Sequence, residues 1–125
     1  MSQAQERYYT VEEANAVLGE VRARLEAIRE ARQTILRTAE KLQRGAHANG
    51  GGTEGSASLE AMATLREGVE ALTRDGIVLR DADTGLIDFP AQRNGKLVYL
   101  CWRPDEEAVT HWHDVEAGFG GRKPL

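Results

Sequence analysis

A long heptad pattern in the N-terminal third is the feature that most constrains the fold. Between residues 10 and 44, apolar side chains recur at alternating intervals of three and four residues, the spacing of a heptad seam. The seam consists of Val11, Ala14, Leu18, Val21, Leu25, Ile28, Ile35, Ala39 and Leu42, with Arg32 at its one charged position. The pattern predicts a single helix over residues 10–44, on the order of 50 Å long. A helix of that length in a chain of 125 residues needs a partner that covers its apolar stripe.

The flanking residues predict where this helix begins and which elements come after it. Thr10, with Glu13 three residues later, matches a capping box, in which each side chain satisfies a backbone amide of the first turn. Residues 45–57 are rich in glycine and predict a flexible loop. A shorter second helix is expected over residues 57–75, in an antiparallel hairpin with the first. Its apolar positions are Met62, Leu65, Val69 and Leu72.

The last third of the chain predicts β-structure. Residues 76–113 hold short apolar runs separated by turn sequences, among them Asn94-Gly95, which favours a tight hairpin. The run KLVYLCW is apolar on both alternating faces and predicts a central strand. We therefore expect an α+β fold, in which an antiparallel meander of three or four strands packs on the N-terminal half of the long helix. Residues 114–125 are expected to form a glycine-rich tail, and residues 1–125 a single domain.

The unequal lengths of the two helices point to a second copy of the chain. The second helix is expected to be too short to cover the seam of the first, and each buried leucine or isoleucine contributes about 1.5–3 kcal/mol. We therefore expect a homodimer that forms through coiled-coil-like helices. Arg32, within the seam, is expected to set the register by pairing with an acid on a partner helix.

Composition argues against several classes of function. The chain has 16 basic and 20 acidic residues and a net charge of −4, and the arginines of the first helix alternate with glutamates, so a nucleic-acid partner is not expected. A single cysteine excludes an intrachain disulfide. The N-terminus has no signal-peptide pattern, and no apolar run approaches the roughly 20 residues of a membrane span. We expect a cytoplasmic protein without a membrane partner.

The segment HWHDVEAGFGGR, residues 111–122, is the densest set of chemically versatile residues. If residues 108–113 form a strand, His111 and His113 lie on the same face of it. With Glu116, and with Cys101 from the neighbouring strand, they form a candidate site for a divalent metal, since zinc takes three or four such ligands. The chain has no CxxC or HExxH pattern, so we predict no cofactor and keep the metal as the alternative.

A second interpretation makes the same segment a site for an anionic ligand. Glycine-rich turns can direct several backbone amides at an anion. The candidate ligand-binding residues are His113, Glu116, Arg122 and Asp88. The simpler alternative is a tail that Phe119 anchors in the core, with Arg122 paired to Asp88 or Glu116. Spacing alone assigns no catalytic residue.

Several short motifs resemble those of a known family. The sequence YYTVEEANAVL and the combination of GLIDFPA, VYLCWR, WH and GFGGR are similar to the bacterial domain-of-unknown-function family 2203, over nearly the whole chain outside the glycine-rich loop. The matching positions are Asp88, Cys101, Trp102, Trp112, His113, Gly118, Phe119 and Arg122. Gly19 stands where the family usually has proline, and His111 stands where it has another residue, often aromatic, which weakens the metal interpretation. The family is uncharacterised, so the resemblance implies no activity.

The sequence supports two functions. The first is a small cytoplasmic interaction or scaffold protein that acts as a homodimer, with no further protein partner identified. The alternative is a metal- or anion-binding protein, and so a candidate enzyme, that uses residues 111–122.

Overall fold

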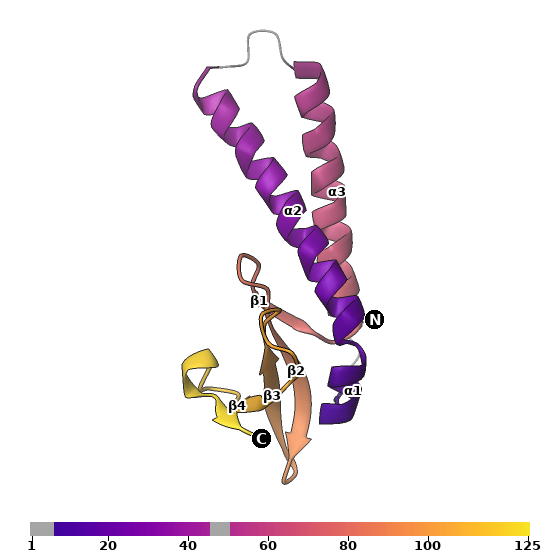
Figure 1. Cartoon of the computed structure of the whole chain (residues 1–125), viewed down its shortest axis with the longest axis vertical. Coiled ribbons are helices and arrows are strands. Elements are labelled where there is room, and N and C mark those ends of the chain that lie inside the picture. Colours follow the sequence, from indigo (N-terminus) through magenta and orange to yellow (C-terminus); the bar gives the residue numbers. More distant parts are fainter. Residues whose placement is uncertain (1–6, 46–50) are drawn as a thin grey trace.

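A computed structural model describes residues 7–45 and 51–125 of the chain. Figure 1 shows two long helices side by side, with one end of the pair next to a small sheet and the other end projecting away from it. Both helices and the sheet come from the regions expected for them, so the α+β fold is confirmed. Residues 46–50 of the expected loop lie outside the described residues.

The expected N-terminal helix is divided into α1 (Val11–Ala16) and α2 (Leu18–Gln43). At Val17 the backbone leaves helical geometry, with φ −99° and ψ 2°. Contacts with the C-terminal third orient α1 separately, because the side-chain oxygen of Asn15 accepts the Val109 amide at 2.8 Å. The prediction of one unbroken helix is therefore wrong, since a tertiary contact of this kind leaves no trace in the heptad spacing.

The predicted start of the helix is confirmed. Thr10 Oγ1 accepts the Glu13 amide at 3.0 Å, and the Thr10 amide donates to Glu13 Oε1 at 3.0 Å, which completes the capping box. Just before it, the Tyr9 amide donates to the Pro90 carbonyl at 2.7 Å and the Tyr9 hydroxyl donates to the Asp75 carbonyl at 2.7 Å. Tyr9 thus fastens the N-terminal segment both to the sheet and to the second helix.

The second helix, α3 (Gly51–Arg74), is longer than expected, so the prediction that residues 51–57 belong to the loop is wrong. Ser58 is buried near this end, because α3 packs on α2 there and this packing overrides the low helix propensity of glycine. The two helices of the hairpin have 26 and 24 residues, so α3 covers much more of the seam than the sequence suggests. Gly76 ends the helix as predicted, with φ 77°.

The sheet has five antiparallel strands in sequence order, at least one more than expected. They are β1 (Val78–Asp81), β2 (Leu86–Arg93), β3 (Lys96–Trp102), β4 (His111–Asp114) and β5 (Lys123–Pro124). The last strand and a 3₁₀ turn, η1 (Phe119–Gly121), come from the segment expected to be a plain tail. Asn94 and Gly95 join β2 to β3 with φ 53° and 79°, as the hairpin signal predicts. The pairing of β1 with β2 is irregular between Leu79 and Asp81.

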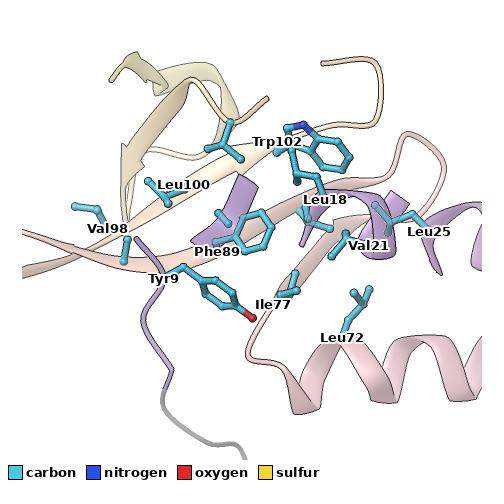
Figure 2. Packing of buried hydrophobic residues seen from close by; sticks show 14 of the residues in the cluster. Tyr9, Leu18, Val21, Leu25, Leu72, Ile77, Phe89, Val98, Leu100 and Trp102 are labelled. Atoms are coloured by element: carbon cyan, nitrogen blue, oxygen red, sulfur yellow. The ribbon is translucent and has the colours of Figure 1, made fainter. Parts of the chain in front are cut away.

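The core lies between one face of the sheet and the first half of α2 (Figure 2). The helices contribute Leu18, Val21, Leu25, Ile28 and Leu72, and the strands contribute Ile87, Phe89, Val98, Leu100 and Trp102. The rings of Tyr9 and Phe89 meet edge to face, with centroids 4.9 Å apart. The prediction that the strands pack on the N-terminal half of the long helix is confirmed.

The opposite side of the sheet, which we call the outer face, carries the side chains that alternate with those of the core. Among the described residues on it are Val78, Arg80, Asp88, Pro90, Leu97, Tyr99, Cys101, His111 and His113. Residues 115–119 lie beside part of this face. A search of the described residues finds no helix with an apolar stretch that would cross a bilayer.

Candidate functional site

Two buried ionisable side chains meet on the outer face. Asp88 on β2 and His113 on β4 are each only 2% exposed. The central strand β3 separates them, since Asp88 pairs with Cys101 and His113 pairs with Tyr99. The side chains reach across that strand, and His113 Nε2 lies 3.1 Å from both carboxylate oxygens of Asp88. A long-range pair of this kind at such depth is costly unless both members are satisfied.

The hydrogen bonds define the state of the imidazole. His113 Nδ1 lies 2.7 Å from the backbone carbonyl of Asp114, and a carbonyl only accepts, so Nδ1 carries a hydrogen. Nε2 faces the Asp88 carboxyl group, and one proton therefore lies between this nitrogen and the carboxylate. In one form an imidazolium pairs with a carboxylate, and in the other a neutral imidazole accepts from a protonated acid.

Arg80 on β1 completes this cluster. Its Nε donates to Asp88 Oδ2 at 2.8 Å. Its guanidinium also lies over the ring of Tyr99, 5.0 Å from the centroid. We call Arg80, Asp88 and His113 the outer-face triad. It places one carboxylate between two nitrogen donors contributed by different strands.

A cavity of about 290 Å³ opens beside the triad. It is lined by the three triad residues, by Leu86 and by residues 115–119. Glu116 is among the lining residues, so the structure brings together three of the four predicted ligand-binding residues, Asp88, His113 and Glu116. The volume is at the small end of the range for small-molecule sites, about 300–1,000 Å³.

The fourth predicted residue, Arg122, lies in a neighbouring cluster instead. Its Nη2 is 2.5 Å from Glu106 Oε2 and donates to His111 Nδ1 at 2.9 Å. The alternative in which Arg122 pairs with Asp88 or Glu116 is therefore wrong, because the loop after β3 brings Glu106 closer. Glu106 is further fixed by the Arg103 amide, which donates to its Oε1 at 2.9 Å.

Phe119 is held by cations rather than by the core. The guanidinium groups of Arg103 and Arg122 lie over its ring, 4.8 Å and 4.5 Å from the centroid. Phe119 is absent from the main core cluster, so the expectation that it anchors the tail there is wrong. It acts as an anchor through these two arginines, and it positions residues 115–119 beside the triad.

The four residues predicted for a metal site, His111, His113, Glu116 and Cys101, do not form one. Among the described residues, no group of three or more histidine, cysteine, aspartate or glutamate side chains is arranged to hold an ion. The hydrogen bonds give the reason: both nitrogens of His113 have partners, and His111 Nδ1 faces Arg122. Cys101 is 1% exposed, and burial raises the pKa of its thiol, which disfavours the thiolate that binds metals.

Sequence reasoning missed Arg80, Arg103 and Glu106. Arg80 has a recognisable signal in the sequence. It lies two residues after Val78 on β1, and a short turn joins β1 to β2, the strand that carries Asp88. Glu106 and Arg103 have none, because they lie in an irregular loop whose partners are distant in the sequence.

A second candidate surface is the part of the helical hairpin beyond the sheet, residues 32–43 of α2 and 55–65 of α3, which we call the arm (Figure 1). Four large apolar side chains are exposed on it, Leu36 (49%), Leu42 (59%), Leu59 (69%) and Met62 (46%). Leu36 comes directly after the seam residue Ile35, and Leu59 and Met62 come directly after Ser58 and Ala61, which are the buried residues of this part of α3. The prediction that Met62 lies in the seam is therefore wrong, since Ala61 takes that place. Because the helices are antiparallel, positions one residue after the seam lie on the same side of the hairpin.

The other side of the hairpin bears out this geometry. Residues one position before the seam, among them Ala27, Thr34, Ala57 and Thr64, together line one shallow hollow of about 340 Å³. The hairpin therefore has one side where small residues and two glutamates, Glu30 and Glu60, line a hollow. The opposite side of the arm carries Leu36, Leu59 and Met62, and we call it the leucine side.

Arg32 has a partner within its own chain. It pairs with Asp83 in the turn between β1 and β2, because the sheet turn reaches this level of α2. Its pairing with an acid on a partner helix stays a prediction.

Comparison with known proteins gives one match. A family model described as "Uncharacterized conserved protein (DUF2203)" matches residues 7–125. No curated protein and no solved structure matches the chain.

Proposed function

Since the chain belongs to the DUF2203 family, whose description names no activity, we propose from the structure that it is an interaction protein that acts as a homodimer through its helical arm. The observation that carries the proposal is the leucine side of the arm. Leu36, Leu59 and Met62 are about half exposed or more, and their positions relative to the seam place them on the same side of the hairpin. Single exposed apolar side chains are common, whereas a contiguous group marks a contact surface.

A second copy of the chain is the occupant that fits this surface. In a two-fold dimer the same patch meets itself, so the apolar side chains of one copy can cover those of the other. Burying one large apolar side chain contributes about 1.5–3 kcal/mol, and the contact duplicates each of the three residues. The dimer then carries two sheets, each with its outer-face triad, on one paired helical stem.

Mass measurement by size-exclusion chromatography with light scattering tests this proposal. We expect twice the chain mass of 13.8 kDa at micromolar concentration, and one chain mass for the variant Leu59→Glu/Met62→Glu. Leu125→Glu is the matched control, because Leu125 is 46% exposed but lies outside the arm. A wild-type monomer, or a double variant that stays dimeric, contradicts the proposal.

A second candidate function is the binding of a small carboxylate or phosphate in the 290 Å³ cavity. It is favoured by the two ionisable side chains, each 2% exposed, that form the cavity wall together with Arg80. Arg80 would hold the anion through its guanidinium group. Titration with acetate and with phosphate, followed by the NMR signals of the His113 ring nitrogens, tests it. Saturable shifts that Arg80→Gln abolishes support anion binding, and unchanged signals contradict it.

A further inference from the structure

The outer face has a second, apolar half that the triad does not use. A groove of about 520 Å³ lies between the C-terminal end of α3, the edge strand β1 and the outer-face residues of β2 and β3. Its wall includes Tyr8, Val69, Val78, Pro90, Leu97 and Tyr99. Tyr8 and Leu97 are 44% and 39% exposed. The volume lies within the range of sites that hold a small organic molecule.

The groove is preformed by anchored residues. Tyr9, which follows the groove residues Arg7 and Tyr8, is 3% exposed and is hydrogen bonded to the carbonyls of Pro90 and Asp75. These bonds hold the adjoining Arg7 and Tyr8 beside the groove. A site that exists before its ligand arrives avoids much of the entropic cost of ordering on binding.

One cationic side chain lines the groove. Of the described residues that line it, Arg7 is the charged one, and its guanidinium is held over the ring of Tyr9, 4.4 Å from the centroid. At the side toward the triad, Arg80 covers Tyr99, but its charge is paired with Asp88. An apolar floor beside the Arg7 guanidinium is complementary to a molecule with an apolar body and an anionic head.

We propose that this groove binds an amphipathic carboxylate, such as a medium-chain fatty acid, with its hydrocarbon chain on Val78, Pro90, Leu97 and Tyr99 and its carboxylate paired with Arg7. The hydrocarbon covers apolar side chains that are now in contact with water, which supplies most of the affinity. The carboxylate end distinguishes this ligand from a neutral one of the same length. This site is separate from the triad cavity and from the arm.

Isothermal titration with decanoate, and with decanol as the neutral equivalent, tests the proposal. We expect saturable decanoate binding and weaker decanol binding. The variant Arg7→Gln should weaken decanoate binding about tenfold or more and leave decanol unchanged, since a hydrogen bond to a charged group contributes about 1.5–3 kcal/mol. Equal affinity for decanoate and decanol in the wild type would overturn the assignment of an anionic head.

A second variant locates the binding site. Leu97→Glu places a carboxylate on the groove wall and should abolish decanoate binding, whereas Leu125→Glu makes the same change outside the groove and should leave it intact. Circular dichroism confirms that both variants fold, as expected for exposed positions. Unchanged decanoate binding by Leu97→Glu overturns the proposal. A change in molecular mass in Leu97→Glu but not in Leu125→Glu also overturns it, because the groove would then be a contact between chains.

Discussion

Asp88 shows how one residue ties three strands together. Its carboxylate on β2 accepts from Arg80 on β1 and faces His113 on β4, at a depth where water contributes almost no compensation. The buried charge is tolerated because both partners are present at once. Removal of one member therefore costs more than the pair itself contributes, since the remaining groups stay buried without a partner.

The variant Asp88→Ala should lower the free energy of unfolding by about 3 kcal/mol or more, because it leaves His113 buried without its partner. Urea denaturation measures this change. Asp83→Ala is the matched control: Asp83 also pairs with an arginine, but its side chain is 66% exposed, so a loss below about 1 kcal/mol is expected. Similar losses in the two variants would contradict the argument from burial.

Cys101 makes the stability depend on pH in the alkaline range. Burial, with smaller contributions from the charges of Asp88 and Glu106, raises the pKa of its thiol above the ordinary value of 9.0. The folded state therefore holds the thiol proton more tightly than the unfolded state does. Its stabilising contribution is fully present below about pH 9 and is lost as the pH rises through the higher pKa of the folded state.

Cys101→Ala should consequently show a smaller decline in the free energy of unfolding above pH 9 than the wild type. Denaturation curves at pH 8 and pH 10 measure the two declines. The pKa of Tyr9 is also raised from 10.0, mainly by burial, but Tyr9 is present in both proteins and cancels in the comparison. If the free energy of unfolding fell equally with pH in the wild type and in Cys101→Ala, the thiol would have the same pKa in the folded and unfolded states, which would contradict the prediction.

Among the helices, two glycines on facing elements have opposite roles. A methyl group at Gly19, near the start of α2, would meet no atom within 4 Å. At Gly68 on α3 it would lie 2.6 Å from Cγ1 of Ile28, a fully buried side chain that would have to shift. Gly68 therefore permits the close approach of α3 to α2, whereas Gly19 is a position of low helix propensity.

We expect Gly19→Ala to raise the free energy of unfolding by up to about 1 kcal/mol, through helix propensity. Gly68→Ala should lower it by about 1 kcal/mol or more, since overpacking a core costs about 1–3 kcal/mol and exceeds the gain in propensity. Thermal and urea denaturation of both variants measure the difference. A stabilising Gly68→Ala would show that the hairpin accommodates a wider separation.

At the scale of the whole molecule, order should decrease with distance from the sheet. Core side chains gather around β2, β3 and the first half of α2, and no residue of α2 beyond Ala31 is buried. Hydrogen exchange should be slowest in β2 and β3 and fastest toward the end of the arm. In the proposed dimer, the arm alone should gain protection as protein concentration rises. A uniform exchange profile would contradict this gradient.

Periodicity was sufficient to predict the architecture, because the core uses it directly. Leu18, Val21, Leu25 and Ile28 are seam residues and are buried, and the alternation along β3 separates Leu100 and Trp102 from Cys101 correctly. The composition of residues 111–122, rather than periodicity, pointed to His113. Local patterns of this kind depend only on the immediate neighbours in the chain.

Features that depend on distant residues were not predictable in the same way. The break in the helix at Val17 coincides with a hydrogen bond between Asn15 and the loop before β4. The partner of Arg122 is Glu106 in that loop, rather than Asp88 or Glu116. The early start of α3 depends on its packing against α2. Each of these outcomes is decided by tertiary contacts that the spacing of residues does not encode.

The two borders of the sheet bear on how the protein avoids fibrous aggregation. One border is β1, which has four residues and an irregular register next to Asp81, and the other is β5, which has two residues and ends in Pro124. Short, kinked or proline-containing borders are poor templates for the addition of further strands. Uncontrolled polymerisation by strand addition is thereby discouraged on both flanks, which leaves helical pairing as the route to a closed and finite assembly.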